Sequence, residues 1–222
     1  MVETMKKVKK LTHNVFLLSG IKNEDRTIIA TRSPYPPHYG ERKLGEYREW
    51  IPSRSKLASM LLSYHFEIKP EWKCLYLGAA SGTTVSHLSD ILDKGIIYAV
   101  EYSAKPFLKL LELAEERRNI VPLLKDASKP ESYSGIVEPV DFLYQDVSQK
   151  NQVEIFLKNI DFFLKKGGEA LLMVKARSID STAKPEDVFR SVLKELEKEN
   201  LEVIKSGELR HHRDHIFVHV RF

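Results

Sequence analysis

From residue 53 onward, short apolar runs of strand length alternate with longer segments in which apolar residues recur every three or four positions. The short runs are typical of buried strands, and the longer segments are typical of amphipathic helices. The predicted strands are 73–77, 95–100, 120–124, 140–145, 168–174, 201–207 and 214–221. The predicted helices are 53–64, 83–92, 104–117, 151–164 and 185–198. This alternation predicts an α/β protein with a doubly wound, mostly parallel sheet and helices on both faces.

Two connections refine this pattern. Lys165–Gly168 has two lysines followed by two glycines, which predicts the end of a helix and then a turn. The last two predicted strands are joined by too few residues for a parallel crossover, so they must form an antiparallel hairpin at one edge. A seven-stranded, mostly parallel sheet closed in this way resembles the Rossmann-like class I fold of S-adenosylmethionine (SAM)-dependent methyltransferases rather than a nicotinamide-binding fold.

Residues 1–50 follow a different pattern, which predicts a small N-terminal β domain ahead of a methyltransferase domain over 51–222. Val15–Leu18 and Thr27–Ala30 have the composition of short strands, and Lys22–Asp25 between them is typical of a turn. The Pro/Tyr segment that follows has three prolines in four positions, which excludes a helix or an interior strand there.

Composition and charge exclude several classes of protein. The 222 residues, of which 42% are hydrophobic, can fill the core of one full domain, which argues against wholesale disorder. The formal net charge is +4, but residues 1–60 hold twelve basic and six acidic side chains, and this local excess suits a polyanionic partner. The single cysteine, Cys74, lies in an apolar run and permits neither an internal disulfide nor a Cys-rich zinc site, so we interpret it as a core residue.

The chain also lacks two sequence signals for membranes and export. No apolar stretch approaches the ~20 residues that a membrane-spanning helix needs. Residues 1–7 lack the apolar core of a signal peptide. The sequence therefore predicts a soluble, cytoplasmic protein without a membrane partner.

The ends of the predicted parallel strands are the places to search for a ligand site, because ligands bind there in open α/β sheets. The first strand ends in the turn Leu77–Val85, where Gly78 and Gly82 allow a tight backbone turn. Thr83 and Thr84 then begin a helix with free N–H groups. The glycine spacing differs from the G-x-G-x-x-G of dinucleotide enzymes, and the turn has no Lys or Arg to bind a pyrophosphate. This favours SAM over NAD.

Acidic residues end the next three strands. Glu101 lies about 20 residues beyond the glycine turn, where a carboxylate can bind both hydroxyls of a ribose. Asp126 could accept a hydrogen bond from an adenine amino group, and Asp146 ends the fourth strand. Each acid alone is more often a helix cap or part of a solvated loop, but together and in this order they outline a site for a cofactor with an adenosine group. The predicted cofactor-binding residues are Gly78, Ala79, Gly82, Thr83, Thr84, Glu101, Tyr102, Asp126, Ala127, Asp146, Val147, Ser148 and Gln149.

Four polar residues are predicted to share the same rim of the sheet. Lys56 lies on the first helix, Asp146 follows the fourth strand, Lys175 follows the fifth, and His215 begins the last. A lysine at a strand end is usually a solvated cap, but these four beside a methyl donor form a candidate catalytic set.

With these motifs in place, the sequence resembles the fibrillarin family in its archaeal form, and the resemblance runs through nearly the whole chain. Tyr102 stands where many members have phenylalanine, and the Gly/Arg-rich extension of eukaryotic members is absent. The segments that carry the resemblance are Trp50–Ala58, Leu77–Val85, Tyr98–Ser103, Lys125–Ala127, Tyr144–Gln149, Val174–Asp180 and Arg213–His215.

The resemblance implies an enzyme that methylates the ribose 2′-hydroxyl of ribosomal RNA, with transfer RNA as a second substrate class. It implies SAM as cofactor and a place as catalytic subunit of a box C/D ribonucleoprotein. The implied partners are a Nop-family scaffold protein, a kink-turn-binding ribosomal-type protein, the box C/D guide RNA and the target RNA. Base pairing with the guide would then select the nucleotide.

Roles for the four rim residues follow from this chemistry. A ribose hydroxyl needs a base to remove its proton, and Lys175 is the candidate base, with the nearby ammonium of Lys56 favouring its neutral form. Asp146 would hold the geometry and stabilise the sulfonium, and His215 would orient the ribose or Lys175. Residues that could touch RNA phosphates, although each alone is more often a plain surface charge, are Arg42, Lys43, Arg48, Arg54, His211, His212 and Arg213.

Two other functions fit parts of the sequence. A small-molecule O-methyltransferase would share the fold and cofactor, but its catechol-type members need a metal bound near the fourth and fifth strands. There, Asp141 lies inside a predicted strand and Lys175 occupies the rim. A structural subunit without catalytic activity would have no need of the Lys-Asp-Lys-His set. Both stay open as alternatives, and no metal site is predicted.

Overall fold

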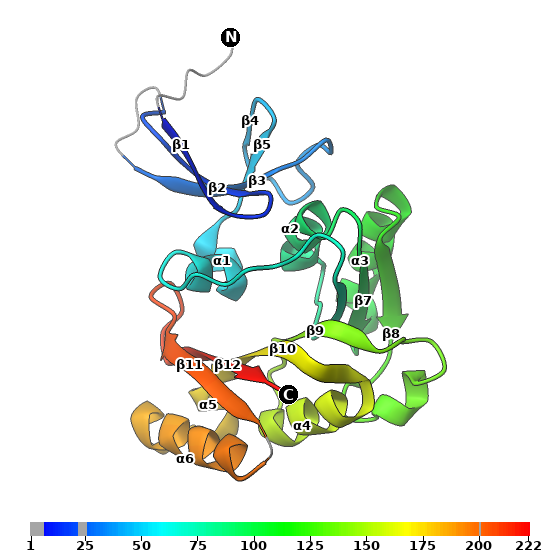
Figure 1. Cartoon of the computed structure of the whole chain (residues 1–222), viewed down its shortest axis with the longest axis vertical. Helices are drawn as coiled ribbons and strands as arrows, with labels where there is room; N and C mark the ends of the chain where they lie inside the picture. The colour runs from blue at the N-terminus through cyan, green and yellow to red at the C-terminus, as the bar shows by residue number, and fades with distance from the viewer. Residues whose placement is uncertain (1–6, 22–25, 200) are drawn as a thin grey trace.

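The structure is a computed structural model, and it describes residues 7–21, 26–199 and 201–222. Two separate sheets organise the chain (Figure 1). The larger sheet has seven strands in the order β11-β12-β10-β9-β6-β7-β8. Its strands are β6 (Lys73–Leu77), β7 (Ile96–Glu101), β8 (Ile120–Leu124), β9 (Val140–Gln145), β10 (Leu164–Lys175), β11 (Glu202–Glu208) and β12 (His215–Arg221).

The pairing of these strands confirms the predicted fold class. The pairs β10·β9, β9·β6, β6·β7 and β7·β8 are parallel, whereas β12 pairs antiparallel with both β10 and β11. The edge hairpin β11–β12 is therefore present. This sheet carries the strand ends at which the sequence predicts the site.

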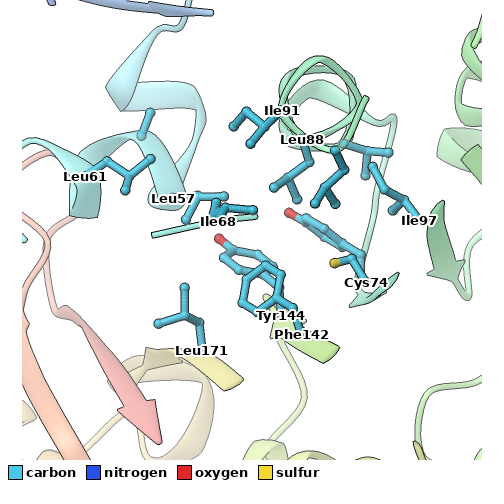
Figure 2. Packing of buried hydrophobic residues seen from close by; sticks show 14 of the residues in the cluster. Leu57, Leu61, Ile68, Cys74, Leu88, Ile91, Ile97, Phe142, Tyr144 and Leu171 are labelled. Atoms are coloured by element: carbon cyan, nitrogen blue, oxygen red, sulfur yellow. The ribbon is translucent and has the colours of Figure 1, made fainter. Parts of the chain in front are cut away.

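Helices cover both faces of the large sheet because its central strands are apolar on both sides. Cys74 and Tyr76 of β6 pack into one hydrophobic cluster, while Leu75 and Leu77 of the same strand pack into the other. The first cluster joins the sheet to α1, α2 and α3, and Figure 2 shows its centre around Cys74. The second joins it to α4 and α6. The helices are η1 (Pro52–Arg54), α1 (Lys56–Leu61), α2 (Thr83–Ile91), α3 (Ala104–Glu116), η2 (Pro130–Tyr133), α4 (Gln152–Phe163), α5 (Ala176–Ile179) and α6 (Pro185–Lys198).

The smaller sheet is built from the N-terminal residues and is antiparallel throughout, with the order β1-β2-β3-β5-β4. Its strands are β1 (Lys7–Thr12), β2 (Val15–Ser19), β3 (Ile28–Arg32), β4 (Lys43–Leu44) and β5 (Tyr47–Glu49). We call residues 7–49 the N-terminal unit. The predicted turn at Lys22–Asp25 lies outside the described residues, as do residues 1–6, and the domain division at residue 50 stays a prediction.

Element boundaries differ from prediction most at the first helix and at the start of β10. The first helix was predicted over 53–64, but the chain forms the short helix η1 and then α1, which ends at Leu61. Lys165–Gly168 was predicted as the end of a helix followed by a turn, but β10 begins at Leu164. The reason is the C-terminal residue: Gly167 donates to the carbonyl of Phe222 (2.6 Å), and the N–H of Phe222 donates to Gly168 (3.1 Å). Within the described ranges, no helix is long and apolar enough to cross a membrane.

Candidate active site

A cavity of about 480 Å³ opens at the carboxyl ends of the parallel strands, where the sequence predicts the ligand site. It is bounded by the ends of β6, β7, β8, β9 and β10 together with Lys56 at the start of α1. The residues that line it are Lys56, Gly78, Ala80, Val100, Glu101, Tyr102, Ser103, Lys125, Ala127, Asp146, Val147, Ser148, Gln149 and Lys175. A second cavity of about 420 Å³ lies between α4 and α6 and contains none of the predicted site residues.

Gly78 forms the floor of the main cavity, where the ends of β6 and β9 approach each other. Its φ is +80°, and a Cβ placed on it would lie 2.7 Å from the carbonyl oxygen of Asp146. The N–H of Asp146 in turn donates to the carbonyl of Leu77 (2.9 Å). A side chain at residue 78 would therefore both strain the backbone and separate the two strand ends.

Glu101 is held in a fixed orientation by the backbone on both sides of it. One carboxylate oxygen accepts from the N–H of Ala80 (2.8 Å) and the other from the N–H of Ser103 (2.7 Å). Each carboxylate oxygen can accept more than one hydrogen bond, so Glu101 keeps acceptor capacity at the cavity wall.

Five predicted cofactor residues do not line the cavity: Ala79, Gly82, Thr83, Thr84 and Asp126. Two of them have clear structural roles instead. Gly82 is buried, and a Cβ on it would lie 2.9 Å from the hydroxyl oxygen of Tyr39 and 2.8 Å from Leu113. Thr84 donates its hydroxyl to Ser55 (2.9 Å). These contacts fix the start of α2, and a contact of these residues with a cofactor stays a prediction.

Asp126 accepts from both the N–H (2.9 Å) and the hydroxyl (2.8 Å) of Ser128. Partial burial opposes ionisation, but the hydrogen bonds from Ser128 outweigh it and hold the pKa of Asp126 below its ordinary value. Its neighbours Lys125 and Ala127 line the cavity, and the contact of Asp126 with an adenine stays a prediction. Tyr102 lies at the mouth and is 71% exposed, leaving a free aromatic surface.

Lys56, Asp146 and Lys175 meet at the inner end of the cavity, as the sequence predicts, and we call them the lysine cluster. The ammonium of Lys56 lies 3.1 Å from one carboxylate oxygen of Asp146, although the two residues are ninety positions apart. The ammonium of Lys175 lies 3.1 Å from the other oxygen and donates to the hydroxyl of Ser148 (2.5 Å). The three side chains are 14–16% exposed. One carboxylate is thus shared by two cations beside an open cavity.

Burial is the main cause that lowers the pKa of Lys56, and the charge of Lys175 adds to it. Asp146 acts in the opposite direction and does not cancel the effect. The ammonium of Lys56 therefore releases its proton more readily than that of an isolated lysine.

His215 joins this group through the pairing of the edge hairpin. It faces Lys175 directly in the antiparallel register of β12 and β10. Its Nδ1 lies 2.5 Å from the carbonyl oxygen of Arg213, which assigns the proton to Nδ1 and leaves Nε2 as an acceptor. Asp214 before it has a φ of +58°, and Arg177 donates to its carboxylate (3.1 Å), so the backbone turn into His215 is fixed.

Burial lowers the pKa of His215, and the charges of Lys56 and Lys175 lower it further, against the opposing effects of the Arg213 carbonyl and Asp146. The imidazole is therefore neutral near pH 7. The neighbouring His212 is half-buried; its Nε2 donates to the carbonyl of Pro52 (2.9 Å), and its ring lies 5.9 Å from that of His215.

Gln152 supports the cluster and was not among the predicted site residues. Its side chain accepts from the N–H of Lys175 (3.0 Å) and donates to the Lys175 carbonyl (3.2 Å). Gln145 donates to the Gln152 carbonyl (2.7 Å), and both glutamines are almost fully buried. A buried amide on an otherwise apolar helix face is the sequence signal that could have found it, because a buried amide needs partners.

The predicted phosphate contacts differ in how exposed they are. The prediction for Arg48 is wrong, because its guanidinium is fully buried and donates to Glu41 (2.9 Å) and Asp90 (2.8 Å), so no phosphate can reach it. Arg54 is exposed and donates to the carbonyl of Tyr39 (3.1 Å). Arg213 is the most open, with 93% of its side chain exposed.

The remaining predicted contacts already have protein partners. Arg42 pairs with Glu49 (2.7 Å), and the exposed Lys43 donates to the carbonyl of Tyr35 (2.7 Å). The ring of His211 bonds to the hydroxyl of Ser59 (3.0 Å). Phosphate binding by these residues stays a prediction.

Asp141, which an alternative metal site would need, lies at the start of β9 and not at its cavity end. Its carboxylate accepts from the backbone N–H of Lys73 (2.9 Å) and from Lys165 (2.6 Å). In the described part of the chain, no three His, Cys, Asp or Glu side chains gather as metal ligands.

Comparisons with known proteins agree on one family. The model of the fibrillarin family matches residues 5–222. A protein of Archaeoglobus fulgidus named fibrillarin-like rRNA/tRNA 2′-O-methyltransferase is 61% identical over 214 residues, which cover 96% of this chain and 98% of the relative. A relative of the same name from Thermococcus sibiricus is 46% identical over 211 residues, covering 90% and 93%.

Solved structures give the same result. A crystal structure of a fibrillarin/Nop5p complex contains a chain 59% identical to this one, with a TM-score of 0.90 and coverage of 96% of this chain and 100% of that chain. Aeropyrum pernix fibrillarin, solved with natively bound S-adenosyl-L-methionine, is 40% identical, with a TM-score of 0.83 and coverage of 97% and 100%. A SAM-dependent methyltransferase from Aquifex aeolicus is only 18% identical but has a TM-score of 0.58 over 77% of this chain and 93% of its own, which shows the shared fold.

Proposed function

The chain belongs to the fibrillarin family, and on that premise we propose that it methylates ribose 2′-hydroxyls of ribosomal and transfer RNA. In this proposal it uses SAM, takes its target from a guide RNA, and is the catalytic subunit of a box C/D ribonucleoprotein. The observation that carries the proposal is the lysine cluster at the inner end of a cavity built on Gly78 and Glu101. Relatives at 61% and 46% identity that bear the methyltransferase name support it.

The cavity fits SAM in size and in donor set. Its volume of about 480 Å³ suits a ligand of this size, and Gly78 supplies a floor without a side chain. Glu101 would accept hydrogen bonds from the ribose hydroxyls, and Tyr102 and Gln149 would bound the adenine. When bound, SAM supplies a methyl group made electrophilic by its sulfonium charge. The carboxylate of Asp146 would then lie at the charged end of the ligand.

The lysine cluster supports removal of a proton from the ribose hydroxyl. A hydroxyl is a poor nucleophile at neutral pH, so its proton must pass to a nearby base as the methyl group transfers. Lys175 is the candidate base. Asp146 holds it in position, and the ammonium of Lys56 shares the same carboxylate, so the two positive charges repel each other. His215, neutral and with Nε2 free to accept, would orient the ribose.

Partners and location are part of the proposal. The fibrillarin/Nop5p complex supports a Nop-family scaffold as partner, and the guide RNA and a kink-turn-binding protein complete the proposed particle. Arg54 and Arg213 are the exposed cations nearest in sequence to Lys56 and His215, so they are our candidates for phosphate contacts near the target nucleotide. The named relatives are archaeal, which supports a cytoplasmic particle.

The test is methyl transfer from labelled SAM to a guide-paired RNA, with the scaffold and kink-turn proteins present. A matched RNA carries 2′-deoxyribose at the target position alone. We expect incorporation into the first RNA and none into the second. Equal incorporation into both would move the acceptor to a base or a protein and would overturn the role of Lys175. Bound SAM with no incorporation into either RNA would favour a structural subunit.

A further inference from the structure

The N-terminal unit contacts the turn between β6 and α2 through the side chain of Tyr39. This residue lies in the Pro/Tyr segment between β3 and β4, and its hydroxyl donates to the backbone carbonyl of Ser81. The adjacent Gly82 packs so closely on the same hydroxyl that a Cβ there would lie 2.9 Å from its oxygen. Ser81 and Gly82 belong to the turn that leads from Gly78 into α2, so Tyr39 supports this turn from outside the cavity.

Tyr39 is itself held in place on several sides. Its N–H donates to one carboxylate oxygen of Glu41 (2.7 Å), and the N–H of His38 donates to the other (3.1 Å). Its carbonyl accepts from Arg54 (3.1 Å), two residues before Lys56. Burial, with the charge of Glu41 adding to it, raises the pKa of the Tyr39 phenol, so the hydroxyl stays protonated and remains a donor.

The N-terminal unit also fixes the far end of α2. Asp90, near the last turn of α2, accepts from the hydroxyls of Thr31 (2.9 Å) and Ser33 (2.8 Å) and from the guanidinium of Arg48 (2.8 Å). The C-terminal end of α2 is thus bound to the N-terminal unit. Tyr39 binds the turn before the N-terminal end of α2 to the same unit, so both ends of the helix are held. The turn is thereby fixed before any ligand enters the cavity.

We propose that Tyr39 is a positioning residue of the SAM site, which makes the N-terminal unit part of the cofactor-binding machinery. The inference rests on the proposed function, because it takes SAM as the ligand of this cavity. Tyr39 does not touch the cavity. It acts through the Ser81 carbonyl and Gly82 on the backbone that carries Gly78 and on Ala80, whose N–H orients Glu101. A turn that is already in position spares the ligand the cost of ordering it.

The test compares wild type with Tyr39→Phe, which keeps the ring and removes only the hydroxyl. Isothermal titration calorimetry would measure the Kd for SAM and for S-adenosylhomocysteine, and steady-state assays of the assembled particle would measure KM for SAM and kcat. We expect both Kd values and the KM to rise about three- to tenfold, the range for one lost hydrogen bond, with kcat at saturating SAM changed less than twofold. The matched control is Tyr35→Phe in the same segment, because Tyr35 meets Arg117 through its ring; its Kd should stay within twofold.

Two outcomes would overturn the role of Tyr39. One is an unchanged Kd in Tyr39→Phe, and a lower melting temperature at that unchanged Kd would indicate a purely structural contact. The other is a fall in kcat with KM unchanged. The wild-type titration separates these results from failure of the proposed function. If wild type binds SAM, a negative result concerns Tyr39 alone; if wild type does not bind SAM, both proposals are overturned.

Discussion

Two buried or largely buried clusters in the described part of the chain share one arrangement of charges, in which an aspartate lies between two cations. In the first, Asp90 accepts from Arg48 (2.8 Å) and from Arg117 (2.7 Å), and we call these three residues the arginine cluster. None of its side chains is more than 1% exposed. It joins β5 of the N-terminal unit to α2 and to the residue that follows α3.

The lysine cluster has the same net charge, but its cations are lysines and it lies beside an open cavity. Its side chains are 14–16% exposed, and all three line the cavity. An arginine in a protein stays charged and offers five donors in a fixed plane, whereas a lysine is a point charge that can lose its proton when it is partly buried. The comparison indicates that one arrangement of charges can hold two units together in one place and, in the proposed function, prepare a proton transfer in the other.

The largest difference that we expect between substitutions in the two clusters is in the rate of methyl transfer. Lys175→Ala should lower methyl transfer about 10²- to 10⁴-fold, the usual contribution of a general base, while the free energy of unfolding changes little. Single-turnover assays with the assembled particle would measure it. Lys165→Ala, at the other end of β10, is the control and should keep wild-type turnover. Turnover near wild type in Lys175→Ala would contradict the assignment of Lys175 as the base. His215→Ala should lower methyl transfer less than Lys175→Ala does.

The next effect is on stability and belongs to the arginine cluster. Asp90→Ala leaves two guanidiniums buried without their shared carboxylate, which should cost about 3–5 kcal/mol in the free energy of unfolding. Urea unfolding would measure it. Asp93→Ala is the matched control, because Asp93 lies just beyond α2 and its side chain is 52% exposed, so it should cost less than about 1 kcal/mol. A loss below 1 kcal/mol for Asp90→Ala would contradict the structural role of the cluster.

A third experiment asks whether charge alone accounts for the arginine cluster. Arg48→Lys keeps the charge, but one ammonium cannot replace a guanidinium that reaches Glu41 (2.9 Å), Ser86 (3.1 Å) and Asp90 (2.8 Å) at once. We expect the free energy of unfolding to fall by about 2 kcal/mol, which corresponds to the loss of two hydrogen bonds. Arg190→Lys, at an exposed pair with Asp187 on α6, should change almost nothing. Equal stability of Arg48→Lys and wild type would show that charge is sufficient.

The two clusters also differ in whether the sequence alone could predict them. The lysine cluster was predictable because Asp146 and Lys175 end parallel strands, and all such ends meet at one edge of the sheet. Lys56 and His215 were predicted to lie on the same rim, and the roles of all four residues followed from the family resemblance. The periodicity that gave the strands and helices of 73–221 follows from local burial, which a sequence expresses directly.

The arginine cluster was not predictable in the same way. Arg48 and Asp90 are 42 positions apart in different units, and the charge of Arg48 alone suggested a phosphate contact. The close packing of Gly82 against Tyr39 was not predicted either. Contacts between units depend on how the two sheets pack, and no local pattern encodes that packing. An acid within the buried stretch of a helix was the one available signal, since buried acids need cations.

The smallest effect is on the pH dependence of stability, and it arises at the edge of the arginine cluster. His87 is fully buried, and its Nδ1 donates to the hydroxyl of Thr31, which donates to Asp90. Burial, with the charges of Arg48 and Arg117 adding to it, holds the pKa of His87 well below 6.5. The folded protein therefore keeps His87 neutral while the unfolded chain takes up a proton below pH 6.5, so stability falls as the pH falls.

Between pH 6.5 and pH 5.5 this linkage should cost about 1 kcal/mol. Urea unfolding of wild type and His87→Gln at both pH values would isolate it, because the other histidines with lowered pKa values, His212, His215 and His219, contribute equally to both proteins. Wild type should lose about 1 kcal/mol more than the variant over this interval. Equal losses would mean that His87 is protonated in the folded state. Lys56 of the lysine cluster does not produce this acid response, because its lowered pKa makes stability rise with pH only on the alkaline side.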